Sequence, residues 1–457
     1  MARSVTILGA GLVGSLLAII LRKRGYEVTI YERRPDMRSN TIAAGRSINL
    51  AMSTRGWNAL ELAGLKEEME QIAIPMTGRY LHQADGTAAF QQYGKNNEAI
   101  YSVSRGELNK KLMTLAEQHG ATIHFEHRCT GVDVPNNTLH FEKLDGEKVT
   151  VQANLLFGAD GAFSALRASY SHMDRVNASH HYLEHGYKEL SIPPDATGKL
   201  QMEQHALHIW PRKNFMMIAL PNTDGTFTCT LFFPFEGSPS FAELQTKEEV
   251  LSFFNQQFPD AVPMMPTLLD DFFGNPTSSL ITTHIDPWYY KDKSALIGDA
   301  AHAIVPFYGQ GMNAGFEDCS VLSGLMDKHG DDWATILKAY YEKRKPNGDA
   351  VAQLALLNFV EMRDKVADPA FLERKKIEKE LGKRYPNQFV SVYEMVSFSH
   401  TPYKTAMSCI QAQDKLLYNI MAQGDFADNI EQKEFCNNLD QWVADYHQSV
   451  QQLDFGK

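Results

Sequence analysis

The alternation of apolar and polar positions predicts a strand, a helix and a second strand at the start of the chain. Residues 5–8 form a short run of β-branched and apolar residues. Residues 12–24 carry apolar side chains at helical spacing and end at Gly25, and residues 27–31 alternate again as a strand. A strand followed by a helix and another strand is the opening unit of a parallel α/β sheet.

Antiparallel strands are expected in the middle of the chain. Residues 76–93 have the pattern of a hairpin around Asp85-Gly86. A meander is expected further on, with strands at 206–210, 215–220 and 226–233 and turns at Pro211 and Pro221-Asn222.

The pattern becomes helical after Asp332 and stays so to the end of the chain. Breaks in this helical pattern are expected near Pro369, Pro386 and Pro402, because proline does not continue a helix.

Composition and charge narrow the function classes. The chain has 457 residues, of which 44% are hydrophobic and 22% charged, with a formal net charge of −11. This is a globular composition, and the lack of long basic runs argues against nucleic acid as a partner. The five cysteines are far apart, which favours free thiols, and His180, His181 and His185 lack the spacing of a metal site. No window is apolar enough for a membrane span, so a cytoplasmic protein is expected.

Gly9, Gly11 and Gly14 form a GxGxxG motif directly after the first strand, at the start of the helix. The first glycine permits a tight turn, the second lets the backbone approach a pyrophosphate, and the third allows close packing of helix and strand. Glu32 ends the second strand, where a carboxylate would hold a ribose hydroxyl. The arrangement predicts a dinucleotide site, without deciding between FAD and NAD.

Two later segments favour FAD. In Gly158-Ala159-Asp160-Gly161 and in Ala295-Leu296-Ile297-Gly298-Asp299, a short apolar run brings an aspartate to the end of a strand. The second segment continues through Pro306 to Gly309-Gln310-Gly311-Met312-Asn313 and then into a helical pattern. This offers a carboxylate to a ribityl hydroxyl and backbone N–H groups to a flavin edge. Two ordinary strand-to-helix corners are the alternative interpretation of each segment alone.

GxGxxG, GADG and GDAAH…P…GQGMN, in this order, resemble the single-component FAD-dependent aromatic hydroxylases. The resemblance implies an α/β fold with a Rossmann-like FAD-binding domain, a β-sheet substrate domain and a C-terminal helical region. The corresponding boundaries are 1–75, 98–180 and 285–345 for the FAD-binding domain, 76–97 and 181–284 for the substrate domain, and 346–457 for the helical region.

Further segments resemble the branch of this family that hydroxylates kynurenine. They are residues 32–36, 45–51, 185–190, 206–211, 358–362 and 402–403. The resemblance implies bound FAD, transient NADPH, O2 as co-substrate, and transfer of oxygen from a flavin C4a-hydroperoxide to the 3-position of L-kynurenine. No catalytic side chain beyond the flavin is implied, and whether the chain forms a homodimer stays open.

Site residues follow from the same resemblance. The cofactor-binding positions it implies are Gly9, Gly11, Leu12, Val13, Gly14, Glu32, Arg33, Arg34, Ala51, Arg105, Cys129, Asp160, Asp299, Pro306, Gly309, Gln310, Gly311, Met312 and Asn313. The substrate-binding positions it implies are Arg79, Tyr93, Tyr403, Asn358, Glu361, Met362, Leu207, Leu220, Phe232, Phe307 and Tyr308.

Arg79 and Tyr93 would clamp the amino-acid carboxylate of the substrate, with Tyr403 as a second hydroxyl. Arginine is a good bidentate partner for a carboxylate, and tyrosine adds a donor. Because side chains alternate along a strand, Arg79 and Tyr93 share a face only if the hairpin loop has odd length. Tyr308 stands where these enzymes usually carry histidine, and its hydroxyl can donate a similar hydrogen bond.

Three alternatives remain at this stage. The same chemistry could act on another aromatic acid. A reductase or desaturase on the same fold would give no hydroxylated product, and a flavin-binding protein would give no turnover at all.

Overall fold

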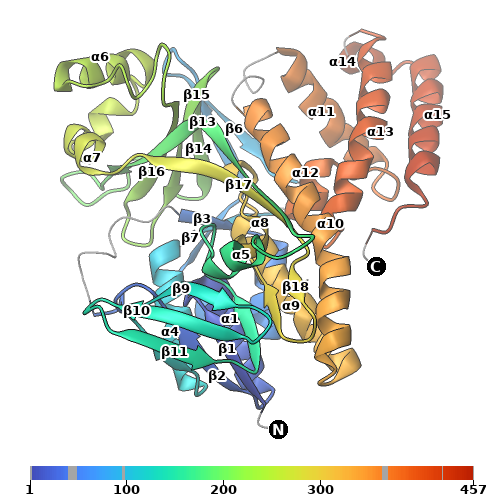
Figure 1. Cartoon of the computed structure of the whole chain (residues 1–457). Coiled ribbons are helices and arrows are strands. Elements are labelled where there is room, and N and C mark those ends of the chain that lie inside the picture. The colour runs from blue at the N-terminus through green and yellow to red at the C-terminus, as the bar shows by residue number, and fades with distance from the viewer. Residues whose placement is uncertain (1–2, 40–48, 95–97, 363–368, 425, 456–457) are drawn as a thin grey trace.

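The computed structural model describes residues 3–39, 49–94, 98–362, 369–424 and 426–455. Figure 1 shows a parallel sheet with its helices at the bottom of the view, an antiparallel sheet at the upper left, and a group of helices on the right. The predicted α/β architecture with a β-rich part and a C-terminal helical region is therefore confirmed. Residues 45–48, which contributed to the resemblance, lie outside the described residues.

The parallel sheet has the strand order β18-β19-β12-β1-β2-β8. Strands β8, β2, β1, β12 and β19 run parallel, and β18 is antiparallel to β19. Apolar side chains bury the sheet between its helices, so its strands are mostly buried. The strands are β1 (Ser4–Leu8), β2 (Glu27–Tyr31), β8 (Thr122–His124), β12 (Leu155–Gly158), β18 (Tyr289–Tyr290) and β19 (Ser294–Leu296).

Helices cover this sheet, and the predicted opening unit is confirmed by β1, α1 and β2. Helix α1 contacts α4 and α9. The helices of this part are α1 (Leu12–Lys23), α2 (Thr54–Leu62), α3 (Lys66–Glu70), α4 (Arg105–Gln118), α5 (Ala165–Tyr170), α8 (Asp299–His302) and α9 (Gly311–His329).

Two small antiparallel sheets accompany the parallel one. The first has the order β3-β7-β4 and the second the order β11-β10-β9. Their strands are β3 (Asn49–Met52), β4 (Ala73–Met76), β7 (Ile100–Ser104), β9 (His127–Asp133), β10 (Thr138–Lys143) and β11 (Lys148–Gln152).

The second large sheet has the order β17-β13-β16-β15-β14-β5-β6. The predicted hairpin forms β5 and β6, and the predicted meander forms β14, β15 and β16. The strands are β5 (Gly78–His82), β6 (Ala88–Gln92), β13 (Asn177–Ile192), β14 (Ala206–Arg212), β15 (Phe215–Pro221), β16 (Phe227–Pro234) and β17 (Ser278–Asp286).

The turn expected at Pro211 was wrong. Pro211 lies inside β14 opposite Met216, and the chain reverses at Lys213 and Asn214, between the paired Arg212 and Phe215. Lys213 has φ of 59°, which a two-residue hairpin loop requires. Proline has no N–H to donate to a neighbouring strand, but it can lie within a strand where that hydrogen bond is not needed. The position of Pro211 therefore did not identify the turn.

Short helices cover the rear face of this sheet. They are α6 (Lys247–Gln257), η1 (Val262–Met264) and α7 (Leu268–Gly274), and their phenylalanines pack with those of β15 and β16. The opposite, front face meets the residues around Phe307 and Phe359.

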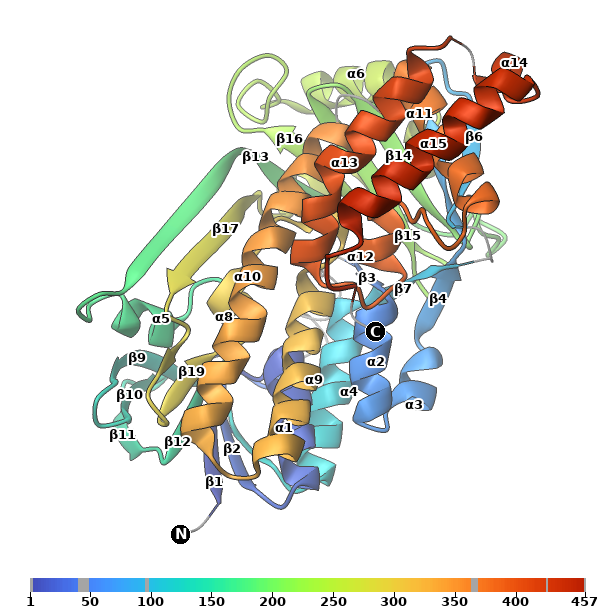
Figure 2. The same ribbon diagram turned by 90° about the vertical axis from the view of Figure 1, so that its right-hand side faces the viewer.

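The C-terminal helices pack beside both sheets. Helix α10 is long and runs along the molecule past α8 and α9, as Figure 2 shows. Helix breaks at Pro369 and Pro402 are confirmed, because α11 begins at the first and α13 follows the second. None of the helices in the described ranges is long and apolar enough to cross a membrane. The helices are η2 (Pro306–Tyr308), α10 (Trp333–Val360), α11 (Pro369–Arg384), α12 (Val392–Ser397), α13 (Tyr403–Met421), α14 (Phe426–Asn429) and α15 (Lys433–Val450).

Candidate active site

The glycine motif forms a tight turn between β1 and α1. Gly9 has φ of 96°, and a Cβ there would lie 2.6 Å from the backbone oxygen of Ala159. A Cβ on Gly14 would lie 2.1 Å from the oxygen of Gly9, whereas a Cβ on Gly11 would meet nothing within 4 Å. The first and third glycines are therefore required by the protein itself, and the second borders open space at the helix N-terminus, where a phosphate is stabilised. Leu12 and Val13 continue the motif in the first turn of α1.

Glu32 faces this turn from the end of β2. It is 5% exposed and accepts hydrogen bonds from the backbone N–H of Ala10 (2.9 Å) and from Nε of Arg34 (2.8 Å). Burial raises the pKa of Glu32, but Arg34 outweighs it and holds that pKa below its usual value. The carboxylate is thus charged beside the glycine turn, while Arg33 and Arg34 are exposed.

Asp160 lies across the turn, after β12. Its Oδ2 accepts from the backbone N–H of Ala165 (2.7 Å), and its Oδ1 is buried without a partner among the described residues. Burial raises the pKa of Asp160. Burial also raises the pKa of Cys129 to about 12, and the nearby charge of Asp160 adds to that rise. An orphaned buried carboxylate oxygen near the glycine turn fits a cofactor that supplies hydroxyl donors.

The second aspartate begins a short helix beside the same turn. Asp299 is half-buried at the first position of α8, after Gly298 with φ of 60°. A Cβ on Gly298 would lie 2.9 Å from Val13, so the strand end and the first turn of α1 are in direct contact. Asp299 therefore lies on the same side of the parallel sheet as the glycine motif, at the carboxyl ends of its strands, where α/β sheets bind ligands.

The Pro306–Asn313 segment is fixed by its own side chains. Asn313 donates to the backbone oxygens of Ala51 and Gly309 (both 2.8 Å) and accepts from the N–H of Ser53 (2.9 Å). Gly309 has φ of 65°, and a Cβ there would lie 3.0 Å from Ala51. Because these contacts hold the turn, its backbone N–H groups are the groups that could contact the edge of a flavin. Pro306, Gly311 and Met312 belong to the same turn and to the start of α9.

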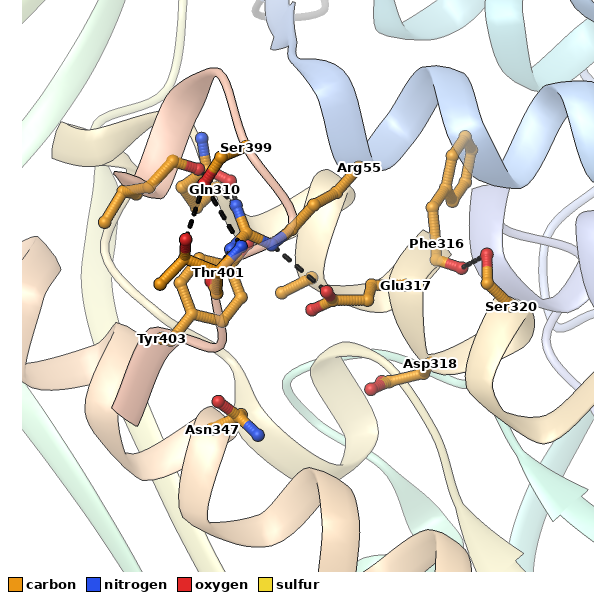
Figure 3. A network of polar contacts seen from close by, with 12 residues as sticks. Arg55, Gln310, Phe316, Glu317, Asp318, Ser320, Asn347, Ser399, Thr401 and Tyr403 are labelled. Carbon is orange, nitrogen blue, oxygen red and sulfur yellow. Dashed lines mark hydrogen bonds and ion pairs between the residues drawn. The ribbon is translucent and has the colours of Figure 1, made fainter. Parts of the chain in front are cut away.

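A buried polar network ties this turn to the C-terminal helices, as Figure 3 shows. Tyr403 donates to Oε1 of Gln310 (2.8 Å), and its ring lies under the guanidinium of Arg55 at 4.1 Å. Arg55 donates to Glu317 (3.1 Å) and to the backbone oxygens of Val396 and Thr401. Arg55 thus holds the loop before α13 against α9, and Tyr403 links that loop to the Pro306–Asn313 segment.

The network continues along α9. Asp318 is fully buried and accepts from Nε of Arg344 (2.6 Å) and from the backbone N–H of Gly298 (3.0 Å), and its Oδ2 lies 2.6 Å from His302 Nε2. Burial raises the pKa of Asp318, but His302 and Arg344 outweigh it and lower that pKa. Asp318 therefore fixes the residue that precedes Asp299.

Arg79 and Tyr93 lie on one face of the hairpin. Arg79 pairs with Gln91, and Tyr93 is two residues further along the same strand direction. The loop between the paired His82 and Ala88 spans residues 83–87, which is an odd length, so the structure meets the condition that the sequence set. Arg79 donates from Nε to Oε1 of Gln91 (3.1 Å), and among the described residues its terminal nitrogens make no hydrogen bond.

A third side chain that the sequence did not single out joins this pair. The ring of Tyr393, at the start of α12, stacks on Tyr93 (5.6 Å between centroids) and on Tyr308 (5.8 Å). Burial raises the pKa of Tyr393, and the charge of Arg79 acts against that rise. Burial likewise holds the pKa of Tyr93 well above its usual value, so both phenols are neutral donors. Through Tyr308, the tyrosine–arginine cluster thus contacts the Pro306–Asn313 segment.

Tyr403 does not belong to this cluster. Its hydroxyl donates a hydrogen bond to Gln310, and its ring packs against the guanidinium of Arg55. Tyr403 is therefore part of the buried polar network. Two tyrosines ten residues apart flank the same loop, and the local sequence carries no signal that decides between them.

Apolar residues from both large parts form the wall beside Arg79. Leu207, Phe232, Phe307 and Met362 belong to one apolar cluster, and Tyr93 and Leu220 to a second. Leu207 packs against both clusters, so the two are continuous. Phe307 lies 4.9 Å from the ring of Phe232 and stacks on Phe359 at 4.0 Å.

Asn358, Glu361 and Met362 approach this wall from the end of α10. Asn358 donates to the backbone oxygen of Phe307 (2.7 Å) and lies 3.3 Å from the sulfur of Met362. Helix α10 ends at Val360, so the helical spacing expected of all three is continued by a π-helical turn at residues 361–362. Glu361 pairs with Lys375 of α11 at 3.4 Å.

The predicted cofactor residue Arg105 lies apart from the glycine motif in the sequence, at the junction of β7 and α4. It opens α4 directly after β7 and is exposed. Within the described part of the chain, no hydrogen bond or ion pair joins Arg105 to the glycine turn, so its assignment stays a prediction.

Known proteins resemble this chain over most of its length. A family model described as "FAD binding domain" matches residues 2–355. A protein of Christiangramia forsetii named kynurenine 3-monooxygenase is 49% identical over 420 residues, which cover 92% of this chain and 94% of the relative. One of Dictyostelium discoideum with the same name is 45% identical over 443 residues, covering 94% and 95%. The chain belongs to the kynurenine 3-monooxygenase family. The predicted FAD-binding fold is thereby confirmed.

Solved structures agree with this at the level of the fold. A 2-methyl-3-hydroxypyridine-5-carboxylic acid oxygenase superposes with a TM-score of 0.65 at 21% identity, covering 81% of this chain and 95% of that one. A p-nitrophenol 4-monooxygenase of Pseudomonas putida DLL-E4 gives 0.66 at 16% identity, covering 83% and 94%. The fold of this kynurenine 3-monooxygenase family member is therefore shared with enzymes whose sequences have diverged widely.

Proposed function

We propose that the protein hydroxylates L-kynurenine to 3-hydroxykynurenine and consumes NADPH and O2. The observation that carries the proposal is the cluster of Arg79, Tyr93 and Tyr393 at the end of a continuous apolar wall. Tyr308 joins this cluster to the Pro306–Asn313 segment, which we assign to the flavin. One charged end and one apolar body is the shape of an aromatic amino acid. The names of the relatives support the choice of kynurenine.

FAD supplies the redox and oxygen chemistry when it is bound, and the glycine turn, Glu32, Asp160, Asp299 and the segment 306–313 would hold it. The protein's own part is to bind and orient the substrate and to exclude water. No acid–base or nucleophilic side chain has to act on the aromatic ring, because the ring amine already activates the neighbouring carbon.

Arg79 takes the substrate carboxylate in this proposal. Its Nε is already held by Gln91, so the guanidinium is fixed in the plane that a bidentate contact needs. Tyr93 and Tyr393 add neutral O–H donors, since burial keeps both phenols protonated. We assign Asn358 and Glu361 to the aromatic-amine side of the substrate, opposite the clamp.

The test is a comparison of Arg79→Ala with Arg79→Lys. The loss of a charge-assisted hydrogen-bonded pair removes roughly 1.5–3 kcal/mol of binding, which is about a 10- to 150-fold rise in KM for kynurenine. Lysine should recover part of this, because it keeps the charge but not the fork. FAD content should be unchanged, and Arg384→Ala, an exposed arginine, is the matched control.

The same assay separates the alternatives. Kynurenine should stimulate NADPH oxidation, and the product mass should rise by one oxygen. A larger stimulation by another aromatic acid would assign the same chemistry to that acid. NADPH oxidation without an oxygenated product would instead favour a reductase, and purified protein without flavin would overturn every version of the proposal.

A further inference from the structure

Two buried histidines and a partly exposed aspartate lie together on the rear face of the seven-stranded sheet. His82 ends β5, His208 lies on β14, and Asp260 lies between α6 and η1. His82 and His208 are 7% and 3% exposed. Nδ1 of His82 lies 2.7 Å from Oδ2 of Asp260, and its Nε2 lies 2.9 Å from Nδ1 of His208. The proposed reaction makes no use of this chain of contacts.

The strand register places the chain directly behind the substrate clamp. Strands β5 and β14 are parallel, with Arg79 opposite Leu207 and Tyr80 opposite His208. Because side chains alternate, Arg79 and Leu207 point to the front face, and His82 and His208 point to the rear. Strand β6 is the edge of the sheet, so β14 is the strand that joins the hairpin of β5 and β6 to the remaining strands.

The hydrogen-bond partners fix the number of protons on the two rings. Nε2 of His208 lies 2.9 Å from the backbone oxygen of Glu203, which can only accept, so this nitrogen carries a hydrogen. A carboxylate at Asp260 likewise only accepts, so Nδ1 of His82 carries one too. The contact between Nε2 of His82 and Nδ1 of His208 needs a third hydrogen, on one of these two nitrogens. Two neutral imidazoles hold only two such hydrogens, so the pair holds one proton in excess.

Of the surrounding charged groups, Asp260 and Glu203 favour the additional proton, whereas the cation of Arg212 opposes it. Burial lowers the pKa of His208 to about 4, which fits its Nδ1 as the acceptor in the contact between the two rings. Burial raises the pKa of Asp260, but its hydrogen bonds outweigh this and hold that pKa below its usual value. The other charged groups that face the chain are Glu203 and Arg212, whose guanidinium donates to the backbone oxygen of His82 (2.9 Å).

We propose that His82 is held as an imidazolium against Asp260, and that this partly buried ion pair positions Arg79 for the substrate carboxylate. The inference rests on the proposed function, which gives Arg79 that role. Loss of the excess proton would set the lone pairs of the two rings against each other and release the end of β5, three residues after Arg79. The value of kcat/KM for kynurenine is therefore expected to fall with rising pH through a rise in KM, while kcat and FAD content stay constant.

The proton count is tested first, on the holoenzyme labelled with ¹⁵N-histidine. The ring-nitrogen spectrum at neutral pH should contain one imidazolium that disappears in His82→Gln. If the spectrum shows both rings of the pair as neutral, the inference is overturned. This outcome does not depend on which substrate is turned over, so it is distinct from a failure of the proposed function.

The positioning role is tested with Asp260→Asn, which keeps the shape of the side chain and removes its charge. The variant should raise KM about tenfold, which corresponds to about 1.4 kcal/mol and lies near the lower end of what a hydrogen bond to a charged group contributes. It should also move the decline of kcat/KM to lower pH. His205→Gln, an exposed histidine just before β14, should match the wild type. An unchanged pH profile in Asp260→Asn, with or without a lower Tm, would leave only a structural role and would sink the proposal.

Discussion

The glycine turn offers a direct test of which positions serve the fold and which serve the cofactor. Alanine at Gly14 would place its Cβ 2.1 Å from the oxygen of Gly9, so α1 has to move away from β1. Overpacking of a filled site costs about 1–3 kcal/mol, and a clash with backbone lies at the upper end. Alanine at Gly11 would meet nothing within 4 Å, and its φ of −72° and ψ of −177° suit any residue.

The two variants should therefore differ in kind. We expect Gly11→Ala to leave the stability of the apoprotein within about 1 kcal/mol of the wild type, because an N-cap glycine exchanged for alanine loses at most that much. Its affinity for FAD should fall sharply, since the added methyl takes space at the helix N-terminus where a pyrophosphate would lie. Gly14→Ala should lose stability in the apoprotein as well.

The measurement is urea unfolding of both apoproteins, together with titration of FAD followed by quenching of its fluorescence. Gly324→Ala is a matched control, because a Cβ at this helical glycine of α9 also meets nothing within 4 Å. Wild-type FAD affinity in Gly11→Ala would refute the assignment of the pyrophosphate to this turn. Equal loss of stability in the Gly11 and Gly14 variants would refute the steric argument.

Three further predictions concern the buried network and the clamp. Arg55→Leu should lower the free energy of unfolding in urea by about 2–4 kcal/mol, because it leaves two buried backbone oxygens without this donor and Glu317 with Arg344 as its remaining arginine partner; a loss below about 1 kcal/mol would contradict this. The lowered pKa of Asp318 means that its stabilising effect is present above the ordinary aspartate range, near pH 4, and is lost as the pH falls through the folded value. Asp318→Asn should accordingly lower Tm at neutral pH and weaken its decline in acid, and an acid limb as steep as that of the wild type would speak against the pairing. Tyr393→Phe should raise KM for kynurenine about 2- to 10-fold at unchanged FAD content, as fits the loss of a neutral donor, whereas the exposed Tyr418→Phe should have no effect.

The sequence predicts the parts of the fold that rest on local rules. The first strand, helix and strand and the meander were found at nearly their observed bounds, because their apolar periodicity is regular and their turns are short. The helices α6 and α7 were not found, since their buried phenylalanines read equally well as strand residues. Hairpin parity was stated as a condition, and the five-residue loop satisfies it.

The site was less accessible to sequence reasoning, because its residues come from distant segments. Tyr393 and Tyr403 are equivalent in residue type, and packing alone brings Tyr393 to Tyr93. The role of Arg55 could not be foreseen either, since two of its acceptors are backbone oxygens that leave no mark in a sequence.

The bonds of Arg55 also say something about the order in which this enzyme can be completed during synthesis. The guanidinium belongs to the first helices of the chain, but its acceptors at Val396 and Thr401 are 341 and 346 residues further on. A ribosome-bound chain with only its nucleotide-binding segments would hold Arg55 paired with Glu317 alone, and the Pro306–Asn313 segment would lack its contact with Tyr403. Full seating of the cofactor is then a late event, which waits for the last helices to emerge.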